Sequence, residues 1–271
     1  MKIDDYQIDI NKFHTSEHLK KCLECIDLTS LNATDTDAKI ELLVKKVNLF
    51  PEHFPHLPYI AALCVFPSFT PIVRKSLTAK GVRIAATSAG FPASHTFLTI
   101  KRQECRMAVE EGAHEVDIVL PFNHFLSGNY TRATEEISAI KESIGKAHLK
   151  VILESGALDS PQAIALASRI AIEGGADFIK TSTGKSSPAA TPEAAVVMCR
   201  EIKAHFQKTG KRIGFKPAGG IVSVEDALTY YAITDAILGP EWLTPELFRI
   251  GASRLANNLL YAISGVQEAY F

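Results

Sequence analysis

The sequence has no excess of charge of either sign and no long apolar run. Its 29 lysine and arginine residues nearly balance 30 aspartate and glutamate residues, which leaves a formal net charge of −1. No global field therefore attracts nucleic acid or an anionic membrane surface, and we expect neither as a partner. The longest apolar stretch, at 59–66, is far too short to span a bilayer. Any attraction for an anionic ligand must come from a local site.

Signals for metal binding, disulfides and export are equally sparse. The five cysteines form an odd, scattered set, and the C-x-x-C spacing of Cys22 and Cys25 has no second pair at ligand spacing. Two partly buried thiols are the simpler interpretation. The nine histidines show no H-E-x-x-H pattern, so we expect no metal site. Residues 1–5 are acidic and lack an apolar segment, so we expect no secretory signal and a cytoplasmic protein.

Short apolar runs alternate regularly with longer stretches of helical period. The predicted strands lie at 25–28, 60–66, 83–87, 115–120, 150–154, 178–181, 213–216 and 248–251. The predicted helices lie at 35–49, 71–80, 97–111, 131–143, 161–173, 192–208, 224–236 and 253–263. Several helices have start signals, such as Ser160 before Pro161 and Thr191 before Pro192, where a capping oxygen precedes a proline in the first turn.

Eight strand–helix units without an intervening linker predict a parallel sheet closed into a single-domain (β/α)₈ barrel. A doubly wound open sheet is the competing fold, and the absence of a G-x-G-x-x-G turn after the first strand weakens it. The eighth strand is uncertain, because residues 236–238 compete with 248–251. We expect the barrel to span 25–264, after an extension at 1–24 that packs as a helix or arm on the barrel's bottom. A tail follows at 265–271.

Ionisable residues stand near the ends of several predicted strands. In a barrel, side chains alternate between the lumen and the helix layer, and active sites gather at the C-terminal rim. In the strand at 115–120 the apolar residues share the outer face, which turns Asp117 inward. The same alternation turns Lys180 and Lys216 inward at the ends of their strands. We therefore expect one carboxylate and two lysines to converge in the lumen.

Two lysines at the ends of neighbouring strands repel each other and are partly desolvated. Both effects favour the neutral amine, so we expect at least one lysine pKa to be depressed. A neutral amine in a dry pocket can condense with a carbonyl to form a Schiff base, and Asp117 could move the protons. The competing interpretation is a buried structural ion pair between Asp117 and one lysine. Two lysines with one aspartate favour the catalytic interpretation.

Loops with glycines, hydroxyls and basic residues follow the last three predicted strands. Gly184 and Lys185 follow one strand, Gly219 and Gly220 the next, and Ser253 precedes the last helix. Glycines allow close approach of the backbone, and helix N-termini attract anions. Together these loops predict a phosphate site, with Lys185 as the countercharge.

Other residues at strand ends carry weaker signals. Glu154 is equally well interpreted as a rim residue or as the partner of a neighbouring lysine. Asp27 and Thr29 end the first predicted strand and could hydrogen-bond within the site, although capping or core roles explain them as well. Cys64 lies in an apolar strand, where packing is the simpler interpretation.

The segments FIKTSTGK at 178–185 and GFKPAGGI at 214–221 resemble deoxyribose-phosphate aldolases. Supporting segments are IDLT at 26–29, LCVFP at 63–67, EVDIV at 115–119 and RIGAS at 249–253. They occur in the family's order and cover the chain from about residue 25 to residue 260.

The resemblance implies a class I aldolase that needs neither metal nor cofactor. Such an enzyme interconverts 2-deoxy-D-ribose 5-phosphate with acetaldehyde and D-glyceraldehyde 3-phosphate, and it serves deoxyribonucleotide breakdown. Lys180 then matches the Schiff-base lysine, Lys216 the second lysine that lowers its partner's pKa, and Asp117 the acid/base aspartate. Phosphate-site positions match the following residues: Gly184, Lys185, Gly219, Gly220 and Ser253.

The chain departs from the family at Arg254, where a small hydroxyl residue is common, and Tyr270 is penultimate where some members end in a tyrosine. We assign neither residue a role. Two other functions stay open: a Schiff-base aldolase or transaldolase for another sugar phosphate, and a non-catalytic phosphate-binding barrel. A homodimer is compatible with the sequence, which does not determine the oligomeric state.

Overall fold

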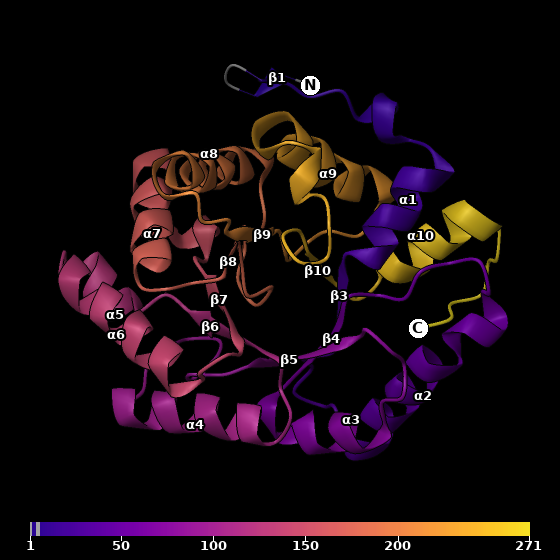
Figure 1. Ribbon diagram of the computed structural model, residues 1–271, viewed down its shortest axis with the longest axis horizontal. Helices are drawn as coiled ribbons and strands as arrows, with labels where there is room; N and C mark the ends of the chain where they lie inside the picture. Colours follow the sequence, from indigo (N-terminus) through magenta and orange to yellow (C-terminus); the bar gives the residue numbers. More distant parts are fainter. Residues whose placement is uncertain (1, 4–5) are drawn as a thin grey trace.

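Eight parallel strands pair in one sheet in the computed structural model, which describes residues 2–3 and 6–271. Figure 1 shows these strands as a ring with helices around it. The strands are β3 (Ile26–Thr29), β4 (Ala62–Val65), β5 (Arg83–Thr87), β6 (Glu115–Val119), β7 (His148–Ile152), β8 (Phe178–Lys180), β9 (Gly214–Lys216) and β10 (Ile250–Ala252). They pair in the order β10-β3-β4-β5-β6-β7-β8-β9. Parallel bridges from Phe215 to Phe248 and from Ala218 to Gly251 join β9 to the β10 segment. The (β/α)₈ barrel predicted from the alternation is confirmed.

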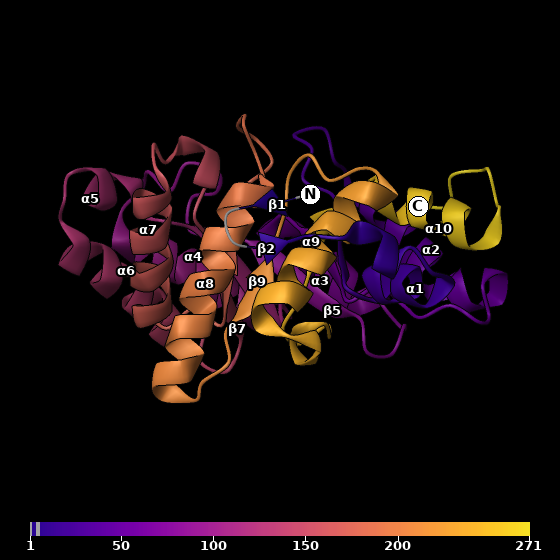
Figure 2. The ribbon, with the colours of Figure 1, turned by 90° about the horizontal axis from the view of Figure 1, so that it is seen from above.

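Ten α-helices occur among the described residues, and most of them cover the outside of the barrel. They are α1 (Ser16–Glu24), α2 (Asp37–His53), α3 (Thr70–Ser76), α4 (Leu98–Glu110), α5 (Phe122–Leu126), α6 (Tyr130–Ser143), α7 (Pro161–Glu173), α8 (Pro192–Thr209), α9 (Val224–Leu238) and α10 (Leu255–Ser264). Side-chain oxygens of Ser160, Thr191 and Ser223 accept hydrogen bonds from the first turns of α7, α8 and α9. Figure 2 shows these three helices side by side along the barrel. No helix in the described part of the chain is long and apolar enough to cross a membrane.

Several boundaries differ from the sequence prediction. The competing run at 236–238 belongs to the end of α9, and β10 pairs with β3, so the eighth strand lies near 248–251 as expected. The short helix α5 follows β6 and was not predicted. Helix α2 begins after Thr36, whose hydroxyl accepts from the Lys39 N–H, rather than at residue 35.

The segment before the barrel packs on helices of the barrel. Helix α1 contacts α9 and α10, and it buries Leu19, Cys22 and Leu23. Cys22 and Cys25 are fully buried free thiols, and burial raises the pKa of Cys22 to about 12. Their burial is more complete than the sequence suggested, because α1 continues directly into β3. Residues 1, 4 and 5 of the predicted extension lie outside the described residues.

The lumen and the helix layer contact opposite faces of each strand, so lumen side chains must fit a fixed space. Phe178 is 1% exposed and packs within it beside charged groups, 5.7 Å from the Lys150 Nζ to the ring centre. A Cβ at Gly214, on the neighbouring strand, would lie 2.2 Å from the Phe178 ring. Gly214 therefore makes room for an aromatic ring that has little freedom to move.

This packing makes Gly214→Ala a sharp test of the fold. The added methyl group should overpack the lumen and lower the free energy of unfolding by about 3 kcal/mol. Gly81→Ala is the control, because a Cβ there meets nothing within 4 Å and bears only the strain of φ +86°, about 1 kcal/mol. Urea unfolding of both variants measures the free energy of unfolding. Equal losses in the two variants would contradict the close packing of Phe178 against Gly214.

Candidate active site

Three ionisable side chains meet in the barrel lumen: Asp117 of β6 and the last residues of β8 and β9, Lys180 and Lys216. The Nζ atoms of Lys180 and Lys216 each donate to the same oxygen, Asp117 Oδ2, at 2.8 Å. All three side chains are buried. The convergence predicted from strand alternation is therefore confirmed, and Asp117 pairs with both lysines rather than with one.

A second layer of charges supports this trio. Arg249 places Nη1 2.6 Å from Asp27 Oδ1 and Nη2 2.7 Å from Glu115 Oε1. Lys150 Nζ contacts Glu115 Oε2 and lies 3.4 Å from Asp117 Oδ1. Asp27 Oδ2 also contacts Lys216 Nζ. The lumen thus holds three carboxylates among four basic side chains, and each buried carboxylate has basic partners.

The electrostatics of this cluster keep Asp117 and Lys216 ionised. Burial alone would raise the pKa of Asp117, but Lys150, Lys180 and Lys216 hold it well below its usual range. Burial would lower the pKa of Lys216, but Asp117 and Asp27 together raise it above the usual lysine value. Ion pairing with two carboxylates therefore outweighs desolvation at Lys216, and Lys216 is not a lysine with the depressed pKa that the sequence predicts for at least one of the two.

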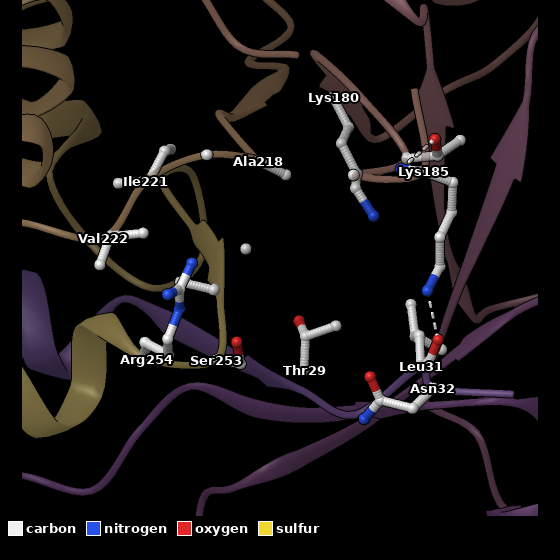
Figure 3. A pocket seen from close by; sticks show the side chains of 16 residues that line it. Thr29, Leu31, Asn32, Lys180, Lys185, Ala218, Ile221, Val222, Ser253 and Arg254 are labelled. Carbon is white, nitrogen blue, oxygen red and sulfur yellow. Dashed lines mark hydrogen bonds between the residues drawn. The ribbon is translucent and has the colours of Figure 1, made fainter. Parts of the chain in front are cut away.

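A cavity of about 280 Å³ opens beside the cluster, at the C-terminal ends of β3, β8, β9 and β10. Figure 3 shows the Lys180 side chain extending into it. Among the three convergent residues, Lys180 alone lines the cavity, so it is the one that a ligand there can touch. All the predicted phosphate-site residues also line it: Gly184, Lys185, Gly219, Gly220 and Ser253.

The loops after β8 and β9 pack against each other in this wall. Gly184, Gly219 and Gly220 have φ angles of +76°, +88° and +79°. A Cβ at Gly219 would lie 2.8 Å from the Ala189 Cβ and 3.2 Å from the Gly184 Cα. Glycine at 219 is therefore required both by its left-handed backbone and by the contact between the two loops.

Basic side chains project around the cavity from different loops. Among the described residues, those that line the cavity include Lys180, Lys185 and Arg254 and no carboxylate, so the cavity suits an anionic ligand. Lys185 reaches across to the β3–α2 connection, where its Nζ donates to the Leu31 carbonyl (Figure 3). Arg254 directly precedes α10, and its side chain makes no cap hydrogen bond there.

Tyr270 lies away from the cavity. Its hydroxyl donates to the Lys46 carbonyl on α2 at 2.7 Å, and its ring packs on Phe50 and Phe54. This contact fastens the C-terminal segment to the outside of the barrel.

Sequence reasoning missed Glu115, Lys150 and Arg249 and gave Asp27 only a weak claim. A usable signal existed for Glu115, since it stands two residues before Asp117 and therefore shares its face. Lys150 pairs in register with Asp117 on the neighbouring strand. That register was not readable from the sequence, because it depends on how the barrel closes.

Comparison with known proteins identifies the family of this chain. The sequence profile described as DeoC/LacD family aldolase matches residues 22–244. The deoxyribose-phosphate aldolase of Homo sapiens is 42% identical over 267 residues, covering 93% of this chain and 84% of that protein. The Bos taurus protein of the same name is 40% identical over 267 residues, with the same coverage.

A solved structure supports the fold independently. The tetrameric deoxyribose phosphate aldolase from Aeropyrum pernix superposes with a TM-score of 0.71 at 24% identity, covering 95% of this chain and 98% of that one. The profile match and the whole-length relatives show that this chain belongs to the DeoC/LacD family of aldolases.

Proposed function

We propose that the protein reversibly cleaves 2-deoxy-D-ribose 5-phosphate to D-glyceraldehyde 3-phosphate and acetaldehyde through a Schiff base on Lys180. The observation that carries this proposal is the position of Lys180, whose amine joins the buried cluster at Asp117 and also faces a cavity lined by basic residues. Relatives about 40% identical over nearly the whole chain bear the name of this activity.

The reaction begins with the open-chain aldehyde form of the sugar. Attack on C1 requires a neutral amine, so Lys180 first passes a proton to a nearby base, and Asp117 Oδ2 lies 2.8 Å away. Addition of the amine and loss of water give an iminium. Removal of the C3 hydroxyl proton then breaks the C2–C3 bond, and its electron pair moves into the iminium to form an enamine. D-glyceraldehyde 3-phosphate leaves.

The second half of the reaction returns the enzyme to its starting state. Protonation of the enamine at C2 regenerates an iminium, and water releases acetaldehyde from Lys180. In our proposal Asp117 and Lys216 supply and remove these protons, because a shared carboxylate oxygen connects Lys216 to Lys180. The ionised pair also keeps a fixed electrostatic environment around the reacting nitrogen.

The phosphate is held at the other side of the cavity in this proposal. Backbone N–H groups of the glycine loops and the start of α10, together with the Lys185 amine, would surround it. Anchoring the far end of the sugar places C1 against Lys180 and turns the addition into an effectively intramolecular step. Arg254 adds a further basic group to the lining.

The proposal extends to the protein's location, metabolic role and assembly. A cytoplasmic enzyme of deoxyribonucleotide breakdown is consistent with the balanced net charge of −1 and with the buried free cysteines. Assembly as a homodimer is part of the proposal, and sedimentation would measure it. No metal or cofactor takes part in the steps above.

Borohydride trapping tests the nucleophile directly. Reduction in the presence of deoxyribose 5-phosphate should add a stable adduct to Lys180, found by peptide mass mapping. Lys180→Met should abolish both the adduct and turnover, because Lys185 is the only other lysine among the described residues that line the cavity, and its amine bonds to the Leu31 carbonyl. Lys185→Ala should still form the adduct at saturating substrate. An adduct on another residue, or the same rate on fructose phosphates as on deoxyribose 5-phosphate, would contradict the proposal.

Lys185 is expected to govern substrate affinity. Lys185→Ala removes a charge-assisted hydrogen bond to the phosphate, worth about 1.5–3 kcal/mol, and should raise KM for deoxyribose 5-phosphate about 10- to 100-fold. The turnover number should change little. Lys211→Ala, an exposed lysine in the α8–β9 connection at the opposite end of the barrel, is the control. Equal effects of the two variants would assign the phosphate to other groups.

Chelation tests the metal-free chemistry. After incubation with EDTA and removal of the chelator, the rate of cleavage should equal that of untreated enzyme, because the amine itself provides the electron sink. Loss of activity that zinc or magnesium restores would contradict the Schiff-base mechanism.

A further inference from the structure

Glu154 lies directly after β7 in a conformation that is unusual for its residue type. Its backbone is left-handed, with φ 46° and ψ 57°, and its side chain is 5% exposed. Left-handed residues other than glycine are strained, and they persist where the surrounding structure holds them in place. No ion pair to the Glu154 carboxylate occurs among residues 2–3 and 6–271. A neighbouring lysine, one of the two roles that the sequence allows for Glu154, is therefore not what holds the Glu154 side chain.

The Glu154 carboxylate instead bonds to one residue of the neighbouring loop through both of its oxygens. Oε1 accepts from the Thr183 N–H at 3.1 Å, and Oε2 accepts from the Thr183 hydroxyl. The same hydroxyl accepts from the Lys185 N–H at 3.0 Å. Because the Thr183 hydroxyl donates its proton to Glu154, the lone pairs of the hydroxyl oxygen are free to accept from the Lys185 N–H. A chain of hydrogen bonds thus runs from Glu154 to the residue whose amine faces the cavity.

The turn that carries Glu154 also packs closely on this loop. The Ser155 N–H donates to the Thr181 carbonyl at 2.9 Å. A Cβ at Gly156 would lie 1.8 Å from the Pro188 carbonyl oxygen, so no other residue fits there without a shift of the backbone. Contacts therefore hold the loop at its beginning, its middle and its end.

We infer that Glu154 is a positioning residue that sets the conformation of the 181–188 loop for binding the substrate phosphate. This inference rests on the proposed function, because it assigns the phosphate to the cavity wall at Gly184 and Lys185. Glu154 does not line the cavity and acts through Thr183. Its carboxylate fixes which way the Thr183 hydroxyl points, and thereby holds the Lys185 backbone.

The direction in which phosphate affinity changes when Glu154 loses its charge distinguishes a positioning role from a purely electrostatic one. A carboxylate near an anion site repels the anion, so removing its charge would strengthen phosphate binding if Coulomb interaction dominated. A positioning role predicts weaker phosphate binding instead. Glu154→Gln leaves one acceptor oxygen and places an NH₂ group against the Thr183 hydroxyl, which already accepts from the Lys185 N–H. The loop should lose its fixed geometry, and affinity should fall.

The experiment compares cleavage of 2-deoxyribose 5-phosphate with cleavage of unphosphorylated 2-deoxyribose. Glu154→Gln and Thr183→Val should each lower kcat/KM for the phosphorylated sugar about tenfold, as expected for a lost hydrogen bond to a charged group. For deoxyribose the change should stay within about twofold. The double variant should lose no more than either single variant, because both break one chain of contacts. Thr183→Ser, which keeps the hydroxyl, should recover most of the loss.

Asp159→Asn is the matched control, since it removes one carboxylate charge from the exposed part of the same connection. Equal losses on both sugars, additive losses in the double variant, or tighter phosphate binding by Glu154→Gln would each overturn the inference. If the wild-type protein cleaves neither sugar, the proposed function fails. Calorimetric titration with inorganic phosphate then tests the role of Glu154 separately from the cleavage reaction. Weaker phosphate binding by the Glu154→Gln variant than by the wild type supports the positioning role, and unchanged phosphate binding refutes it.

Discussion

The architecture of the site depends on one carboxylate oxygen, Asp117 Oδ2, that two lysine amines share. Such a group is stable in a lumen only if further charges compensate it, and the neighbouring strands supply Lys150, Arg249, Asp27 and Glu115. The barrel achieves this because its strands bring residues from distant parts of the sequence into register. Asp117 opposes Lys150 on one side, and Lys180 opposes Lys216 on the other. The three convergent residues and their counterions are thus parts of one arrangement.

Much of this fold was readable from the sequence, for reasons that are local. Strands buried on both faces read as short apolar runs, and the helices between them begin at residues such as Ser160 and Thr191, whose hydroxyls cap the first turn. Helix α5 escaped prediction because its five residues, Phe122–Leu126, are too few for a helical period to show. The N-terminal helix α1 carries few apolar residues, and its burial depends on contacts with α9 and α10 from the other end of the chain.

The site residues also divide into those that patterns within one strand predict and those that depend on contacts between distant strands. Alternation along single strands was enough to turn Asp117, Lys180 and Lys216 inward. The raised pKa of Lys216 could not be predicted, because it depends on Asp27, a residue of the first barrel strand that contacts Lys216 only once the ring has formed. Glu154 was left undecided for a similar reason. Its partner, Thr183, lies in the connection after the next strand, and no pattern within either segment reveals the pairing.

The hydrogen bond from Lys185 to the Leu31 carbonyl affects how tightly the cavity can bind an anion. Its ammonium group donates to the Leu31 carbonyl, so an anion that binds through Lys185 must compete with a backbone acceptor. The net gain is the difference between two polar contacts and not the whole strength of either. On departure of the anion the amine has its old acceptor to return to. An anion held by Lys185 is therefore bound less tightly than one that meets an ammonium group without a competing acceptor.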